Sequence, residues 1–120
     1  MIRVLCDVGK NRVLLEFSGQ PSQADLTAAE IDLRAGLARL RSPVDVLSDV
    51  SQLDSLEAIS MADLERTGAM LRELGVRRVV RVVGRSKSGA LQMERISRLL
   101  KHSAHLAFSR EEAEDLLSQR

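Results

Sequence analysis

The segment from Val44 to Leu64 constrains the fold more than any other part of the chain. Val44–Val50 is a mostly apolar run that predicts a buried strand, and a polar loop follows it. Ser60, with Asp63 three residues later, predicts the first turn of a helix. In open α/β sheets of this kind, sites usually lie where strands end, so the loop is the first place to look for function.

The size and composition of the chain favour one globular domain over residues 1–120. Apolar residues make up 44% of the chain and charged residues 29%, which is typical of a folded protein with a single core. No apolar run approaches the roughly 20 residues that span a bilayer, and the N-terminus lacks the pattern of a signal peptide. The lone Cys6 cannot form an internal disulfide, so we expect a cytoplasmic location.

Hydrophobic periodicity predicts alternating strands and helices along the whole chain. The strands are expected at residues 2–8, 12–18, 44–50, 76–83 and 105–108. The helices are expected at residues 22–41, at 60–74, around Met93, Ile96 and Leu100, and from 109 onward. The short polar turn at residues 9–11 predicts an antiparallel hairpin, whereas helical connections predict parallel pairing elsewhere. The fold class is therefore α/β, with a mixed five-stranded sheet of order ββαβαβαβα and helices packed on it.

The loop after the third strand gathers hydroxyl and carboxylate groups. The candidate phosphate-acceptor or partner-binding residues are Asp49, Asp54, Ser55, Ser60 and Asp63. A phosphate at a helix N-terminus meets a favourable dipole, while neighbouring carboxylates oppose it. A charge change there could switch partner binding, whereas the alternative is that Ser60 serves only as a helix cap.

Further motifs resemble those of STAS domains, the fold of bacterial anti-sigma factor antagonists, and in particular the SpoIIAA-like family. The segment Arg78–Gly84 looks like the fourth strand of that family. Phe108 followed by Glu111–Leu117 resembles its ending, a Phe and then an acidic-acidic-Ala-x-x-Trp-Leu helix, with Leu116 in place of Trp. The resemblance implies a regulatory module without catalytic activity that binds a protein partner.

The resemblance also implies a phosphorylation site, with one departure. Anti-sigma factor antagonists carry Asp-Ser-Ser-Gly at the start of the helix after the third strand, and a Ser there is phosphorylated. This chain has Asp54-Ser55-Leu56-Glu57 and then Ile59-Ser60-Met61, so neither copy keeps the Ser-Gly pair. Both Ser55 and Ser60 remain candidates.

Positive charge is concentrated in one part of the sequence. Residues 76–110 hold nine basic side chains and one acidic side chain. The candidate anion-binding residues are Arg77, Arg81, Arg85, Lys87, Arg95 and Arg98. Spacing along the fourth strand predicts that the first three point to one side. An anionic partner, including an anionic membrane surface, is one interpretation, and a solvated charged face is the other.

Several function classes are not expected. The chain has two Phe and neither Trp nor Tyr, so stacking on bases is limited and we do not expect sequence-specific nucleic-acid binding. No nucleophile, base and carboxylate set is evident, so we expect no enzyme. His102 and His105 lack further ligands nearby, so we expect neither a metal nor a cofactor.

Two functional hypotheses follow. The first is a protein-interaction module that uses the 51–60 loop and the second helix as its contact face. The second is a carrier or sensor of a small apolar or lipid-like molecule, held in a cavity lined by Met61, Leu64, Met70 and Met93. The free edge of the predicted hairpin also allows a homodimer.

Overall fold

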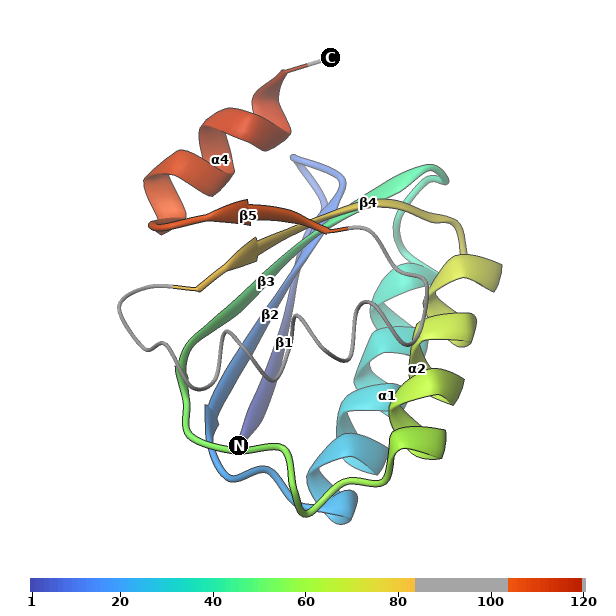
Figure 1. The fold of residues 1–120 in the computed structure, drawn as a ribbon. Helices are drawn as coiled ribbons and strands as arrows, with labels where there is room; N and C mark the ends of the chain where they lie inside the picture. Colours follow the sequence, from blue (N-terminus) through green and yellow to red (C-terminus); the bar gives the residue numbers. More distant parts are fainter. Residues whose placement is uncertain (84–103, 120) are drawn as a thin grey trace.

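The computed structural model describes residues 1–83 and 104–119. The strands in these residues are β1 (Ile2–Asp7), β2 (Arg12–Gly19), β3 (Val44–Leu53), β4 (Val76–Val82) and β5 (His105–Ala107). The helices are α1 (Gln23–Leu37), α2 (Met61–Glu73) and α4 (Arg110–Ser118). The strands form one sheet in the order β1-β2-β3-β4-β5 (Figure 1). The helix predicted around Met93 lies outside the described residues.

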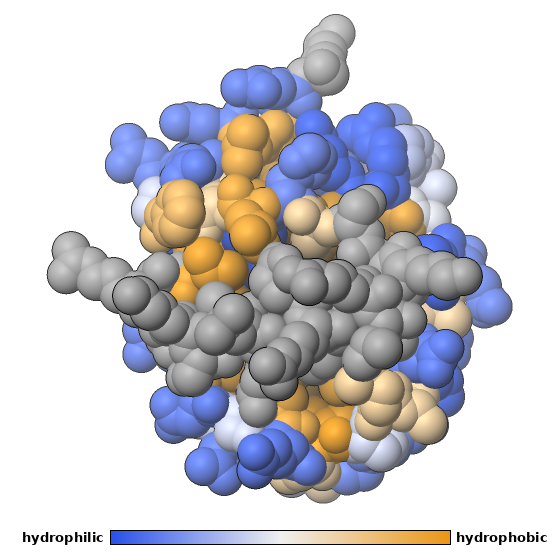
Figure 2. Space-filling view, viewed as in Figure 1, coloured by the Kyte–Doolittle hydropathy of each residue, from blue (hydrophilic) through white to orange (hydrophobic). Residues whose placement is uncertain are grey.

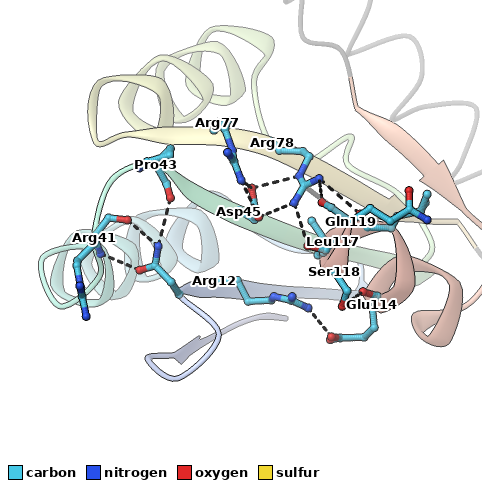
Figure 3. Close-up of polar contacts among 12 residues, drawn as sticks. Arg12, Arg41, Pro43, Asp45, Arg77, Arg78, Glu114, Leu117, Ser118 and Gln119 are labelled. Carbon is cyan, nitrogen blue, oxygen red and sulfur yellow. Dashed lines mark hydrogen bonds and ion pairs between the residues drawn. The ribbon is translucent and has the colours of Figure 1, made fainter.

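The pairing of the strands confirms the predicted mixed sheet. β1 and β2 are antiparallel, and each later neighbouring pair is parallel. Asn11 ends the hairpin turn with a φ of 53°, a left-handed conformation that Asn adopts more readily than most residues. Its side chain accepts a hydrogen bond from the Arg41 N–H and donates to the carbonyls of Arg41 and Pro43 (Figure 3). These bonds hold the turn against the segment that leads into β3.

Helices cover both faces of the sheet, with α1 and α2 on one face and α4 on the other (Figure 1). Side chains alternate along β3, so Val46 packs towards α1 and α2 while Leu47 packs towards α4, each 1% exposed. A strand that is buried on both faces reads as a continuous apolar run, which explains the pattern at Val44–Val50. The face on which α4 packs is called the α4 face below.

The three helix starts that the sequence predicts at Ser22, Ser60 and Ser109 are present. Each Ser side chain accepts a hydrogen bond from the backbone N–H three residues later, at 3.1, 3.2 and 3.1 Å respectively. At Ser22 the cap is reciprocal, because the Asp25 carboxylate also accepts a hydrogen bond from the backbone N–H of Ser22. At Ser109 it is not, because the Glu112 carboxylate accepts from the N–H of Phe108 at 3.1 Å. These caps satisfy backbone donors that the first helical turn leaves without partners.

Three predicted boundaries or faces differ from the structure. β3 continues to Leu53, past the predicted end at Val50, because its last residues pair with the end of β2 beyond a register shift. α1 ends at Leu37 rather than near residue 41, since the following turn tightens into i to i+3 hydrogen bonds. Met61 is 41% exposed, whereas Met70 is 5% exposed and lies in the core, so only the second of these two methionines packs inward.

α1 lies unusually close to β1 at Gly36. A Cβ atom added to Gly36 would lie 2.0 Å from the Cys6 sulfur, far inside van der Waals contact. Burial raises the pKa of the Cys6 thiol, which keeps it protonated at neutral pH. The small residue on the helix and the small thiol on the strand therefore fit each other.

We predict that Gly36→Ala destabilises the protein by about 1–3 kcal/mol, because the added methyl group displaces the Cys6 side chain or shifts α1. Removing the sulfur in Cys6→Ala should restore most of that loss in the double variant. Chemical denaturation of the wild type, both single variants and the double variant measures this coupling. Additive effects of the two substitutions would contradict the close contact.

Candidate functional site

The rim, residues 54–60, connects β3 to α2 and has a fixed shape. Leu56 and Ile59 are 4% and 5% exposed and pack in a core cluster with Leu26 and Val50. The backbone N–H of Asp54 donates to the Gly19 carbonyl at 2.8 Å. These contacts bury the apolar side of the loop and leave its polar side chains at the surface.

The two candidate hydroxyls of the rim differ in their surroundings. Ser55 is half-buried, and its Oγ accepts a hydrogen bond from the N–H of Glu57 at 3.1 Å, which closes a local turn. Ser60 is exposed at the N-cap of α2, and its hydroxyl donates to Asp63 at 2.7 Å. The Ser60 hydroxyl is therefore the more accessible of the two.

Asp63 connects Ser60 to α1 through a chain of charged groups. The hydrogen bond from Ser60, helped by the charge of Arg66, holds the pKa of Asp63 below its ordinary value. Arg66 contacts Asp63 at 2.6 Å and Glu30 of α1 at 3.0 Å. The Thr67 hydroxyl also donates to Glu30 at 2.8 Å. A change of charge at Ser60 would therefore act on the contact between α1 and α2.

Asp49, the remaining candidate carboxylate, lies on the α4 face and has a different set of partners. It is 8% exposed, accepts from the Ser51 N–H and hydroxyl at 3.0 and 2.6 Å, and pairs with Arg110 at 2.7 Å. Burial pushes its pKa upward, but the bonds from Ser51 and Arg110 prevail and hold the pKa below its ordinary value. Asp54 and Asp63, by contrast, lie with the serines of the rim or next to it.

The structure gives the C-terminal end of α4 a cation that the sequence analysis missed. Arg78 of β4 pairs with Asp45 at 2.8 Å and donates to the carbonyls of Leu117 and Gln119 at 2.9 and 3.0 Å (Figure 3). The hydrogen bond with Asp45 raises the pKa of Arg78 above its ordinary value. A guanidinium is favoured at this end because the last carbonyls of a helix carry partial negative charge.

Ion pairs of Arg110 and Glu114 hold the rest of α4 to the sheet. Arg110 at its first turn contacts Glu16 as well as Asp49, and Glu114 in its middle contacts Arg12 of β2 (Figure 3). A sequence signal existed for these pairs. α4 has Glu111 and Glu112 in its first turn, as the helix dipole favours, but no basic residue in its last turn, so its C-terminal carbonyls lack a cation from the helix itself. Such a helix needs charged partners from elsewhere in the fold.

The predicted basic set is only partly within the described residues. Arg77 has an exposed side chain and lies 3.4 Å from Asp45, whereas Arg81 is 8% exposed and pairs in register with Ser48. The other four members, Arg85, Lys87, Arg95 and Arg98, lie outside the described residues. An anionic partner for this set therefore stays a prediction.

The described residues contain few other features that suggest chemistry. Among residues 1–83 and 104–119, no group of three or more His, Cys, Asp or Glu side chains could hold a metal ion. Over the same ranges, no helix is both long enough and apolar enough to cross a membrane. In Figure 2, apolar residues reach the surface among hydrophilic ones in the region where Figure 1 places α4 and β5. Leu106 and Phe108 are 42% and 72% exposed there.

A comparison with solved structures matches the whole chain. The anti-sigma factor antagonist SpoIIAA, in its unphosphorylated form, superposes with a TM-score of 0.71 over 100% of both chains, at 9% sequence identity. The chain has the SpoIIAA-like STAS fold. This confirms the fold that the resemblance implied, and an identity this low carries the fold alone. No family model matches the sequence, and no curated protein matches it either.

The ion pair between Asp49 and Arg110 predicts that the attachment of α4 weakens in acid. Because the folded pKa of Asp49 lies below its ordinary value of 3.8, its stabilising effect is present above that value and is lost as the pH falls through the folded pKa. Asp49→Asn should cost about 1–3 kcal/mol at pH 7 and flatten the loss of stability below about pH 5. Urea unfolding from pH 2 to 7 measures both effects.

Asp32→Asn is the matched control for this experiment, because Asp32 is exposed on α1. It should leave the stability and its pH dependence close to those of the wild type. An Asp49→Asn profile that runs parallel to the wild type down to pH 2 would contradict the assignment.

Proposed function

We propose that this chain is a regulatory STAS-like module that binds a protein partner through the rim and the start of α2, with Ser60 as the phosphate acceptor. The observation that carries the proposal is the exposed Ser60 hydroxyl at the N-cap of α2, in a chain whose whole length adopts the fold of an anti-sigma factor antagonist. The matched structure is the unphosphorylated form of SpoIIAA, which supports a comparable modification here.

The position of Ser60 suits a phosphate better than that of Ser55. α2 has 13 residues, so the first backbone N–H groups and the dipole of the helix favour an anion at its N-terminus. The oxygens of both serines accept a backbone hydrogen bond, but Ser55 is half-buried whereas Ser60 is exposed. A kinase can reach the exposed hydroxyl without opening the loop.

Phosphorylation at Ser60 would rearrange the contact between α1 and α2. The modified oxygen can no longer donate a hydrogen bond to Asp63. The phosphate also repels the Asp63 carboxylate, which lies 2.7 Å from the Ser60 oxygen in the unmodified protein. Arg66 contacts both Asp63 and Glu30, so a phosphate on Ser60 would compete with these carboxylates for the same cation. The rim would thus change its charge and the side chains around it together, which is what a switch of partner binding requires.

The fixed shape of the rim supports a binding role. Leu56 and Ile59 hold the loop backbone in place, so a partner meets a preformed surface and little conformational entropy is lost on binding. The exposed groups Asp54, Glu57 and Ser60 give that surface acidic and hydroxyl character. A partner with basic side chains opposite the rim fits this chemistry.

We predict that Ser60→Glu abolishes or strongly weakens partner capture, whereas Ser60→Ala preserves it and prevents phosphorylation. The chain is expressed with an affinity tag in the cells from which it comes, and recovered proteins and phosphopeptides are quantified by mass spectrometry. Wild-type protein should carry phosphate on Ser60 and not on Ser55.

Ser118→Glu is the matched control, because Ser118 is exposed on α4 and the substitution adds the same charge away from the rim. It should capture the same partner as the wild type. A partner that binds the Ser60→Glu and Ser118→Glu variants equally, or phosphate found on Ser55 alone, would rule out Ser60 as the switch.

A further inference from the structure

β1 is at the end of the sheet, and in the described residues it pairs with β2 alone. Met1 and Ser18 exchange both of their backbone hydrogen bonds, at 2.7 and 2.9 Å. Hydrogen-bonded and non-bonded pairs alternate along an antiparallel ladder, so every second residue after Met1 also bonds to β2. The residues whose backbone groups face the free edge instead are Ile2, Val4 and Cys6.

On the α4 face, side chains form rows that run across the strands and end at β1. The registers place an apolar row in the middle, formed by Leu5, Leu14, Leu47 and Val80. One neighbouring row alternates in charge and is formed by Asp7, Arg12, Asp45 and Arg78. The other begins with a cation and is formed by Arg3, Glu16 and Asp49.

These rows leave a self-complementary pattern at the free edge. Leu5 is 42% exposed, with Arg3 on one side of it and Asp7 on the other, both exposed. A two-fold axis at Leu5 exchanges the positions of the cation and the anion. Edge strands with free backbone groups are templates for pairing with another strand. The edge is therefore complementary to itself in backbone bonding, in charge and in apolar character.

We propose that β1 pairs antiparallel with β1 of a second copy of this chain, with the two-fold axis at Leu5. Leu5 then lies opposite Leu5 of the partner subunit, and Arg3 lies opposite Asp7 of the partner subunit, twice by symmetry. The apolar row continues across the interface. The alternation of charge across the strands continues as well. Arg12 of β2 lies beside Asp7 of β1, and Asp7 then lies beside Arg3 of the partner subunit.

Backbone geometry and charge select this register over its neighbours. A backbone hydrogen bond across the interface needs residues on both strands whose backbone groups face the free edge, so Val4 pairs with Cys6 of the partner subunit. A shift by one residue would place such residues opposite residues that face β2, and every backbone hydrogen bond across the interface would be lost. A shift of the axis to Val4 places Arg3 against Leu5, and a shift to Cys6 places Leu5 against Asp7. Only the axis at Leu5 matches unlike charges and apolar groups together.

Charge reversal tests the proposal in a way that loss of folding cannot mimic. In either Arg3→Asp or Asp7→Arg alone, two pairs of like charges face each other, and the homodimer should weaken at least about tenfold. Mixing the two variants restores both unlike pairs, so a heterodimer should form with an affinity near that of the wild type. Sedimentation equilibrium of each protein and of the mixture measures this.

The matched control is Glu65→Arg, an equal reversal on the exposed side of α2, which should dimerise like the wild type. Three outcomes overturn the proposal. They are a wild-type chain that stays monomeric up to about 1 mM, a dimer that charge reversal at Arg3 or Asp7 leaves unchanged, and a mixture that fails to form a heterodimer while each variant keeps its fold by circular dichroism.

Cross-linking tests the register itself. In a Cys6→Ala background, Leu5→Cys places two thiols directly opposite each other in a non-hydrogen-bonded pair, where side chains are closest. Mild oxidation should give a disulfide-linked dimer. Val8→Cys in the same background is the control, because Val8 is also exposed but faces Ile2 of the partner subunit. Equal cross-linking of both variants would overturn the register.

This edge shares no residue with the rim. Failure of the dimer would therefore leave the proposed role of Ser60 untouched, and the reverse also holds.

Discussion

The attachment of α4 depends on two carboxylates of β3, Asp45 and Asp49. They lie four residues apart on one strand and so share one face of the sheet. Through Arg78, Asp45 holds the C-terminal carbonyls of α4 (Figure 3). Through its ion pair with Arg110, Asp49 holds the first turn. Because the two ends are fixed separately, the helix has one position and one direction on the sheet, and its apolar side chains meet Leu47 of the central strand.

α4 packs over β3, β4 and β5, so among the described residues no helix covers the β1 side of the same face. A cleft of about 400 Å³ lies there, lined in part by Leu5, Leu14 and Leu47, with Arg12 and Glu114 at its margin. Leu47 is 1% exposed and Leu5 is 42% exposed, so the apolar row passes from the core to the surface as it reaches the edge. The charged rows that hold α4 end at Arg3 and Asp7 of β1. The arrangement of charged and apolar side chains at the free edge therefore follows from the strand registers that also position α4.

The sequence predicted what local patterns determine, namely strand and helix types, parallel and antiparallel pairing, helix caps and the overall fold. It missed the partners of Arg78 and Arg110, because these pairs join residues more than 30 positions apart in sequence. The register that brings Asp45 to Arg78 includes a shift between β3 and β4, which alternation alone cannot show. Asp49 was predicted beside the serines because it ends the apolar run, yet the strand continues past it and its side chain points to the other layer. Of the methionines predicted to line a cavity, Met70 packs in the core and Met61 is exposed.

Hydrogen exchange of α4 in the Asp45→Asn variant tests the central claim most directly, since it measures the attachment of one element rather than the stability of the whole. The account predicts that amides of α4 lose protection at least about tenfold, while those of β2 and β3 keep most of theirs, because Arg78 is left with helix carbonyls and no carboxylate. Protection of α4 that stays at the wild-type level, or that falls equally with every strand of the sheet, would contradict the view that Asp45 holds this helix.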